Sequence, residues 1–259
     1  MAEGRGPMKT AVITGGAGGL GQALSRDLQV RRWRVVLIDL DVSRLQTTDT
    51  QSLVECDLTD PVQLKHAAEG IIAQYDAIDL VIYNAGITQI GAFEDQSDLS
   101  HRKVFEINYF AAVSLAHLLL DAIRRAKGTH LAISSVAGFA PLYHRTSYAA
   151  SKHALEGFFK SLRSEEKIHG VHVQIAAPSF VATNIGKADR QPDGIARPGS
   201  ASDGKDYMTA DAAATEIMRG FDRAQPMILV GRVARLSWWI NRISPRLYQW
   251  LMEREISGS

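Results

Sequence analysis

Short apolar segments alternate with segments of helical periodicity along the chain. This order predicts an α/β fold with a doubly wound parallel sheet and helices on both faces. A glycine-rich loop directly after the first apolar segment, and polar residues after several later ones, support this fold class. We predict about seven strands, at residues 11–13, 33–40, 53–56, 79–83, 130–133, 171–177 and 227–230.

The segments between the predicted strands repeat apolar residues at the spacing of a helix. One of them opens with Asp60 and Pro61, an N-cap residue followed by a proline in the first turn. These elements predict a single domain over residues 1–259. The predicted helices are 22–32, 60–75, 99–126, 148–169 and 210–224.

A formal net charge of +1 on 259 residues gives no reason to expect nucleic acid as a partner, and 46% hydrophobic residues suffice for a sizeable core. Cys56 is the single cysteine of the sequence, so no intrachain disulfide can form and we expect a reducing, cytoplasmic location. Residues 1–7 are predicted to form a loose tail. No apolar run reaches the roughly 18 residues of a membrane-spanning helix.

The loop Thr14–Gly21 ends the first strand and opens the following helix. Glycines let a diphosphate approach the backbone closely, and a helix N-terminus presents free N–H groups with a partial positive charge. This context predicts a Rossmann-type dinucleotide site, the alternative being a glycine turn used only for packing. The residues expected at the cofactor are Thr14, Gly15, Gly19, Leu20 and Gly21.

Asp39 ends the second predicted strand, some 20 residues after the glycines. A carboxylate at that position can accept hydrogen bonds from both ribose hydroxyls of NAD and would repel the 2′-phosphate of NADP. Arg44 follows closely and could weaken this preference, and a carboxylate that only caps a turn is the alternative. We predict NAD as the cofactor.

Polar or special residues end several of the predicted strands. In a doubly wound sheet these strand ends meet at one edge, where ligands bind. We therefore expect a binding site there, formed by Asp39, Asp57, Asn84, Ser135 and Pro178.

Tyr148 and Lys152 are four residues apart, so in a helix their side chains share one face. A nearby ammonium group favours the ionised phenol and should lower the pKa of the tyrosine, which suits proton transfer. The alternative is an ordinary surface helix that carries both residues.

Taken in order, the motifs resemble the short-chain dehydrogenase/reductase family over about residues 8–185. The matching pieces are Thr14-Gly15-x-x-x-Gly19-x-Gly21, Asp57, Asn84-Ala85-Gly86, Asn108, Ser135 and Tyr148-x-x-x-Lys152.

The resemblance implies a role for each matching catalytic position. Tyr148 would be the general acid/base, and Lys152 would lower its pKa and hold the nicotinamide ribose. Ser135 would hydrogen-bond the substrate oxygen. Asn108, a poor helix former within a predicted helix, would hold a relay water next to Lys152.

The resemblance also implies further cofactor contacts, and we expect no metal site. Asp57 would contact adenine, and Thr183 matches the position that binds the nicotinamide amide. Pro178-Ser179 departs from the Pro-Gly that is common in the family, and serine in place of glycine narrows the backbone conformations of this loop. The additional cofactor residues are Leu58, Asn84, Ala85, Gly86, Pro178 and Val181.

Residues 184–208 are rich in glycine, proline and serine and are predicted to form a lid over the substrate. The candidate substrate residues are mostly apolar, which favours a lipophilic alcohol or ketone such as a steroid, a retinoid or a fatty-chain compound. They are Ser135, Phe139, Tyr143, Tyr148 and Phe180.

The C-terminal extension, 233–256, interleaves aromatic residues with arginines and is broken into two helices at Ser244-Pro245. Packing over the substrate mouth, contact with a partner subunit and peripheral contact with a membrane all fit this composition.

These observations predict an NAD-dependent enzyme that interconverts an alcohol and its carbonyl. The alternatives are a non-catalytic dinucleotide-binding sensor or scaffold and an NADPH-dependent reductase of ketoacyl compounds. As is common in the family, we expect a homodimer or homotetramer, with contacts through helices 99–126 and 148–169.

Overall fold

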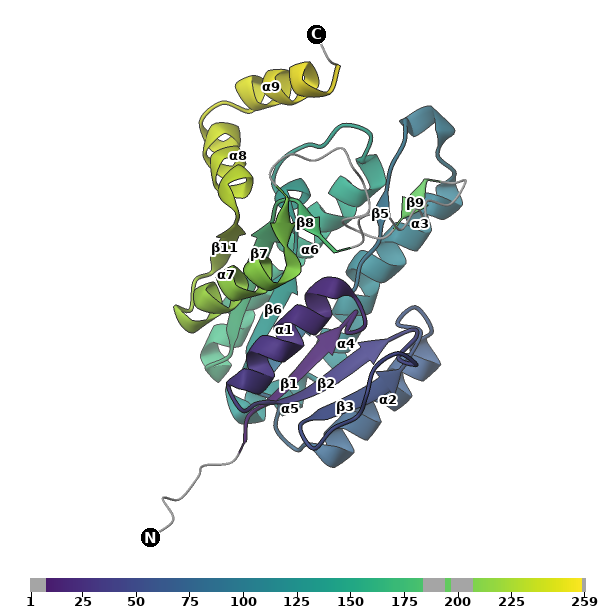
Figure 1. The fold of residues 1–259 in the computed structure, drawn as a ribbon, viewed down its shortest axis with the longest axis vertical. Helices are drawn as coiled ribbons and strands as arrows, with labels where there is room; N and C mark the ends of the chain where they lie inside the picture. The colour runs from purple at the N-terminus through teal and green to yellow at the C-terminus, as the bar shows by residue number, and fades with distance from the viewer. Residues whose placement is uncertain (1–7, 184–193, 197–206, 258–259) are drawn as a thin grey trace.

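A seven-stranded parallel sheet forms the centre of the fold in the computed structural model, which describes residues 8–183, 194–196 and 207–257 (Figure 1). Its strand order is β11-β7-β6-β4-β1-β2-β3, so the order reverses between β1 and β4. In such sheets ligands bind at the carboxyl side of that reversal. The strands are β1 (Thr10–Thr14), β2 (Arg34–Asp39), β3 (Gln51–Glu55), β4 (Leu80–Tyr83), β6 (Thr129–Ile133), β7 (His172–Pro178) and β11 (Met227–Val230).

Helices cover both faces of the sheet, which explains why its strands are nearly continuous apolar runs. On one face Leu64 of α2, Leu115 of α4 and Phe159 of α6 pack in one buried cluster. On the other face Leu24 of α1 and Ile217 of α7 lie in a second cluster. The predicted doubly wound fold is therefore confirmed. These helices are α1 (Gly19–Val30), α2 (Pro61–Gln74), α4 (Ala111–Leu118), α6 (Thr146–Glu166) and α7 (Ala210–Asp222).

The predicted helix 99–126 is not continuous. It consists of α3 (Asp98–Phe105), a π-helical turn η2 (Glu106–Phe110), α4, and α5 (Leu120–Ala126) after a break at Leu119. The π turn contains Asn108, whose side chain bonds to backbone outside the helix. Single π turns of this kind occur often at functional sites.

Two small sheets escaped prediction because each strand has only two residues. β5 (Thr88–Gln89) pairs with β9 (Ile195–Ala196), and β8 (Val181–Ala182) pairs with β10 (Met208–Thr209). The predicted lid, 184–208, lies outside the described residues except for 194–196 and 207–208. Of its described residues, Ile195, Ala196 and Met208 belong to these two sheets.

Two helices end the chain, and the predicted break between them is confirmed. They are α8 (Arg232–Ile243) and α9 (Pro245–Ser257), with the Ser244 hydroxyl accepting a hydrogen bond from the N–H of Leu247. Both stand beyond the end of the sheet (Figure 1). In the described part of the chain no single helix is long and apolar enough to cross a membrane. Helices Asp98–Leu118 and Leu120–Ala126 meet that test only together, as a pair bent by 61°.

Candidate active site

Ser135, Tyr148 and Lys152 lie together at the carboxyl end of β6. Ser135 follows this strand and caps the short helix η3 (Val136–Gly138), and Tyr148 lies in the first turn of α6, with its hydroxyl hydrogen-bonded to Ser135. The Nζ of Lys152 lies 5.9 Å from the centre of the Tyr148 ring and donates to the carbonyl oxygen of Ile133 at 2.9 Å. The structure thus brings the three predicted residues into one cluster.

The pKa of Tyr148 differs from the expected direction. Burial raises it, and the hydrogen bond with Ser135 and the charge of Arg145 oppose that rise only in part. Burial also lowers the pKa of Lys152 to about 8, against the opposing charge of Glu156. Loss of water around both groups outweighs the attraction that their spacing implies.

Asn108 is buried and hydrogen-bonded on all sides of its amide. Its Oδ1 accepts from the N–H of Ile87 at 2.8 Å, and its Nδ2 donates to the Ile87 carbonyl and to the Ser151 hydroxyl, both at 2.9 Å. A Cβ on Gly86 would lie 3.2 Å from this Oδ1 and 3.6 Å from the Nζ of Lys152. Asn108 therefore ties the π turn to the catalytic helix, next to the lysine.

Glu156 is a buried residue of this site that the sequence analysis missed. Its Oε1 accepts from the Ser134 hydroxyl at 2.8 Å and its Oε2 from the Nζ of Lys160 at 2.6 Å, while its side chain is 1% exposed. Gly138 leaves the room that this carboxylate needs. The signal was present, because Glu156 follows Lys152 at the same four-residue spacing that separates Lys152 from Tyr148.

The glycine loop and the end of β4 are joined by a set of hydrogen bonds. The Thr14 hydroxyl accepts from the N–H groups of Asn84 and Ala85, at 3.0 and 3.1 Å. The Asn84 amide donates to the carbonyls of Thr14 and Gly15, both at 3.0 Å. Gly15 has a φ of +65°, and a Cβ there would lie 2.9 Å from the Cα of Ala85, so no side chain fits.

The N-terminus of α1 fits a diphosphate. Its N-cap, Gly18, makes no side-chain cap bond, and the first turn carries no acidic residue, so its N–H groups can meet an anion. A Cβ on Gly19 would lie 3.2 Å from Thr183, and one on Gly21 would collide with the Gly15 carbonyl. The residues predicted to bind a dinucleotide diphosphate therefore form a close-packed cradle with Thr183.

Asp39 lies beside this cradle. Its Oδ2 accepts from the N–H of Ala17 in the glycine loop, and its Oδ1 from the N–H of Leu40, both at 2.8 Å. The carboxylate is therefore held at the end of β2, the place where a ribose would meet it. These contacts fit the predicted adenosine side of the site.

The other predicted cofactor residues lie at the same strand ends. Asp57 accepts from the N–H and hydroxyl of Thr59 after β3, and Leu58 packs against the apolar core. Pro178 ends β7, and Val181 opens β8. Ser179, the departure from the family pattern, is accommodated by a glycine, because a Cβ on Gly231 would lie 2.7 Å from the Ser179 hydroxyl.

The predicted substrate residues lie in different surroundings. Phe139 packs against Trp238 of α8, with ring centres 4.9 Å apart, and its carbonyl accepts from Asn241 at 2.7 Å. Phe180 lies 5.7 Å from Tyr207, whereas Tyr143 is exposed and stacks on His144. The C-terminal helices therefore reach the segment that follows Ser135.

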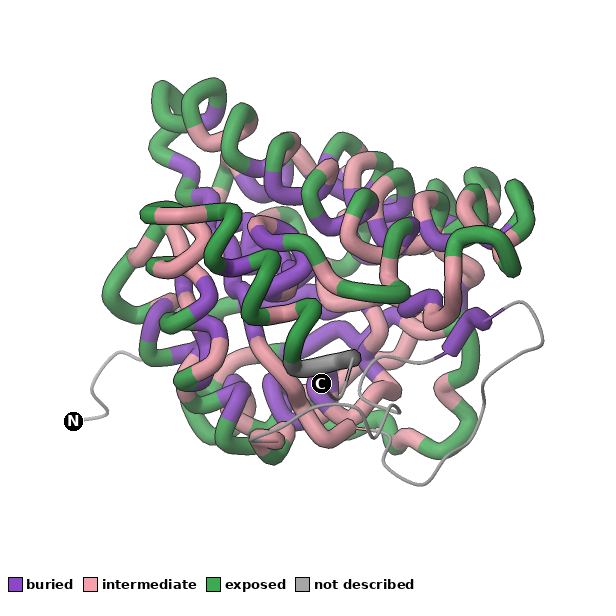
Figure 2. The backbone as a smooth tube through the Cα atoms, turned by 90° about the horizontal axis from the view of Figure 1, so that it is seen from above, coloured by how far each residue is buried: buried purple, intermediate pink, exposed green. Residues whose placement is uncertain are grey.

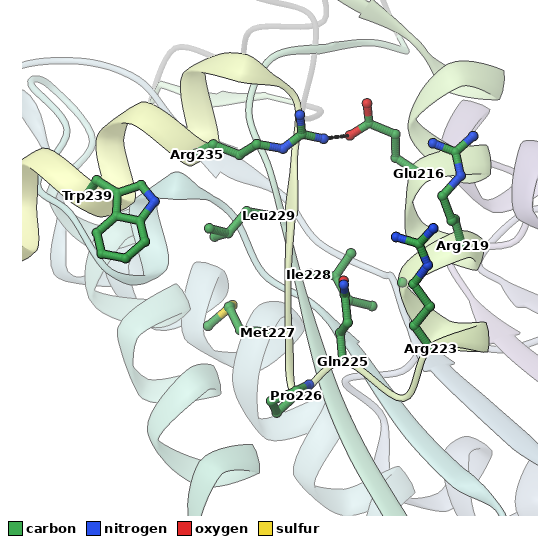
Figure 3. Close-up of a pocket in the computed structure, with 11 residues that line it drawn as sticks. Glu216, Arg219, Arg223, Gln225, Pro226, Met227, Ile228, Leu229, Arg235 and Trp239 are labelled. Atoms are coloured by element: carbon green, nitrogen blue, oxygen red, sulfur yellow. Dashed lines mark hydrogen bonds and ion pairs between the residues drawn. The ribbon is translucent and has the colours of Figure 1, made fainter.

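A pocket of about 530 Å³ lies elsewhere, between α7, β11 and α8 (Figure 3). Glu216 and Arg219 of α7 and Arg223 just after it lie on one side, and Arg235 and Trp239 of α8 lie on the other. None of its lining residues belongs to the predicted site. Among the residues that the structure describes, no group of three or more histidine, cysteine, aspartate or glutamate side chains could hold a metal ion.

Comparison with known proteins identifies the family. The family described as short chain dehydrogenase matches residues 9–194, more than half of the chain. The chain belongs to the short-chain dehydrogenase/reductase family. It is also 31% identical to the rat dehydrogenase/reductase SDR family member 7B over 92% of this chain and 78% of that protein.

Solved structures of this family share the fold. One from Burkholderia cenocepacia, in complex with NADP, has a TM-score of 0.81 at 20% identity and covers 95% of this chain and 97% of its own. One from Burkholderia phymatum, in complex with NAD, has a TM-score of 0.79 at 21% identity, covering 93% and 95%. As a member of the short-chain dehydrogenase/reductase family the protein is an oxidoreductase, so the prediction of an enzyme is confirmed over a binding-only protein.

Proposed function

We propose that the protein interconverts a lipophilic alcohol and its carbonyl compound, with NAD as the preferred dinucleotide. The observation that carries this proposal is the cluster of Ser135, Tyr148 and Lys152 at the carboxyl end of β6, beside the glycine cradle at the strand-order reversal. A nicotinamide dinucleotide held at this edge would accept a hydride in its oxidised form and supply one in its reduced form.

The chain's own residues would handle the proton and the substrate oxygen. Tyr148, whose pKa is raised by burial, stays protonated near neutral pH and is therefore able to donate a proton to a carbonyl oxygen. Ser135, in contact with the same hydroxyl, would donate to that oxygen as negative charge develops on it. Lys152 is buried with its ammonium fixed by Ile133, and would hold the ribose on the nicotinamide side.

The preference for NAD rests on Asp39. Its carboxylate accepts from the N–H of Ala17, so the negative charge faces the place where a 2′-phosphate would lie. Solved structures of this fold are in complex with NADP in one case and with NAD in another, so the preference proposed here rests on the charge of Asp39.

The preference for a lipophilic substrate rests on aromatic rings. Phe139 follows Ser135 by four residues, and Phe180 and Tyr207 pack together beyond the end of β7. Aromatic surroundings favour a substrate that is itself apolar around its reacting carbon.

The test is a panel of alcohols and ketones assayed with NAD(H) and NADP(H). We expect apolar substrates and NAD to give the higher kcat/KM, and Tyr148→Phe to lose about 10³-fold in kcat or more while it keeps its fold and its dinucleotide affinity. Activity that survives Tyr148→Phe would contradict the proposed mechanism. Turnover of short polar polyols alone would contradict the substrate class.

We also propose that subunits associate through η2 and α6. Tyr109 packs edge-on against Phe110 and Phe158 there, and Phe110 is 48% exposed. Light scattering should show a dimer or tetramer that Phe110→Glu reduces to a smaller species, because an exposed aromatic patch loses its apolar partner. A monomeric wild-type protein would exclude this contact.

A further inference from the structure

The two C-terminal helices have one buried side each. Ala234 of α8 and Tyr248 of α9 join Val136 and Ala140 in a small buried cluster, and Asn241 of α8 binds the carbonyl of Phe139. This side attaches the helix pair to the segment that follows Ser135. The packing that the sequence suggested therefore accounts for one side of the pair.

The outer side of α8 carries a stripe of large exposed apolar residues. Leu236, Trp239 and Ile243 are 62%, 63% and 80% exposed and follow one another at helical spacing. Nothing in the described part of the chain covers them. Isolated exposed apolar residues are common on proteins, but a row along one helix face indicates a binding surface.

The outer side of α9 repeats the pattern. Leu247, Trp250 and Leu251 are exposed and share one face of the helix. In Figure 2 the chain that leads to the C-terminus lies nearest the viewer and is coloured mostly as exposed. We call these two stripes together the C-terminal face (Leu236, Trp239, Ile243, Leu247, Trp250 and Leu251).

Positive charge surrounds this face. From Arg232 to Arg254 the sequence holds five arginines and one glutamate, although the whole chain carries a formal net charge of only +1. Arg242 lies over the ring of Trp238 at 4.6 Å, and Arg254 lies over Trp250 at 5.2 Å. Across the pocket of Figure 3, Arg219 and Arg223 lie on the side opposite Trp239, together with Glu216, which pairs with Arg235.

We propose that α8 and α9 dock the protein on the surface of a lipid bilayer that contains anionic lipids. Tryptophan favours the boundary between acyl chains and headgroups, and arginine binds phosphate through paired N–H groups. A second copy of this chain fits less well, because a symmetric contact would place the same arginine-rich surface against itself. The docking chemistry is therefore that of an anionic bilayer surface.

This docking would also position the active site. The same helices hold Phe139, four residues after Ser135, so the substrate entrance would lie close to the bilayer. That consequence rests on the proposed lipophilic substrate, whereas the docking itself does not and is measured without turnover.

The test is co-sedimentation of the full chain with vesicles of phosphatidylcholine alone or with about 30% phosphatidylserine. We expect the protein to bind the anionic vesicles, and salt near 0.5 M to weaken this binding. Its affinity for vesicles of phosphatidylcholine alone should be about tenfold lower. Trp239→Ser/Trp250→Ser and Arg242→Glu/Arg246→Glu should each weaken binding about tenfold or more.

The matched controls change equal numbers of residues outside the C-terminal face. Val30→Ser/Ile168→Ser replaces two exposed apolar residues, each 85% exposed, and Lys103→Glu/Lys167→Glu changes the net charge by the same amount as the arginine variant. Both should bind like the wild type, and circular dichroism should show that all four variants are folded.

Three results would overturn the proposal. The first is no binding of the wild type to anionic vesicles. The second is a loss of binding in the control variants equal to that in the test variants. The third is a wild-type oligomer that the tryptophan variant dissociates, with no binding of either protein to vesicles. The last result would assign the C-terminal face to a subunit contact. A wild-type protein that binds the vesicles but shows no activity on the panel of alcohols and ketones would refute the proposed function and leave the docking in place.

Discussion

The Nζ of Lys152 donates a hydrogen bond of 2.9 Å to the carbonyl oxygen of Ile133, the last residue of β6. The lysine is 4% exposed, so its charge is held inside the domain by one strand carbonyl and by the nearby carboxylate of Glu156. The carbonyl that holds this ammonium group belongs to Ile133, two residues before Ser135 in the sequence. The charge of the lysine, however, depends on buried neighbours.

Glu156→Gln should narrow the pH range of activity. The Glu156 carboxylate opposes the burial that lowers the pKa of Lys152 to about 8, so the neutral amide should lower that pKa further. The alkaline limb of the kcat/KM profile should then move to lower pH, with activity at about pH 9 reduced roughly threefold to tenfold.

The matched control is Glu165→Gln, which removes an exposed carboxylate from the same helix. It should leave the pH profile unchanged. A uniform loss of activity at every pH in Glu156→Gln would instead indicate that Glu156 acts only through packing.

Asp39→Asn should relax the choice of dinucleotide. The amide keeps the size of the side chain and removes the negative charge that is held against the Ala17 N–H. The ratio of kcat/KM for NAD over NADP should fall about tenfold to a hundredfold. Asp41→Asn, two residues further on and exposed, should leave the ratio unchanged. If Asp39→Asn leaves the ratio of kcat/KM for NAD over NADP unchanged, another residue sets the choice of dinucleotide.

Asn108→Ala should reduce both activity and stability. It leaves the N–H and carbonyl of Ile87 without their buried partner, which costs about 2–4 kcal/mol of unfolding free energy, and it frees the π turn. Chemical denaturation and kcat report the two effects. Gln174→Ala also removes a buried amide, which donates to the carbonyls of Gly220 and Gln225, and should lose stability with kcat retained. Equal loss of kcat in both variants would show that Asn108 has no specific role in catalysis.

His130 should make the fold sensitive to acid. Burial lowers its pKa to about 4, and its Nδ1 bonds the Tyr83 hydroxyl at 2.6 Å while Nε2 has no partner among the described residues. Below about pH 6.5 His130 is protonated in the unfolded chain but stays neutral in the folded chain. The free energy of unfolding therefore falls as the pH drops from about 6.5 to 4. The contribution reaches about 3 kcal/mol.

Urea denaturation across that pH range measures this effect. His130→Gln should flatten the pH dependence, because the amide does not titrate, whereas His172→Gln, at an exposed position, should keep it. The pair of Arg124 and Glu166 acts on the same ring with opposite signs, which leaves burial as the main cause. An unchanged slope in His130→Gln would show that another group is responsible.

The sequence alone was enough to predict the sheet, the glycine cradle and the shared helix face of Tyr148 and Lys152, and the family resemblance added the catalytic role of Ser135. These features depend on local rules, namely the period of apolar residues, the backbone freedom of glycine at Gly15, and the four-residue spacing along a helix. Each can be recognised within one short segment, so no knowledge of distant contacts is required.

Only the tertiary structure decided the electrostatics and the exposed faces. Burial raises the pKa of Tyr148, and Asn108 lies in a π turn where its amide binds Ile87. Glu156 belongs to the site because its carboxylate accepts a hydrogen bond from Ser134. Of the two adjacent tryptophans, Trp238 packs on Phe139 and Trp239 is exposed. Burial and hydrogen-bond partners come from distant parts of the chain, which is why spacing alone does not determine them.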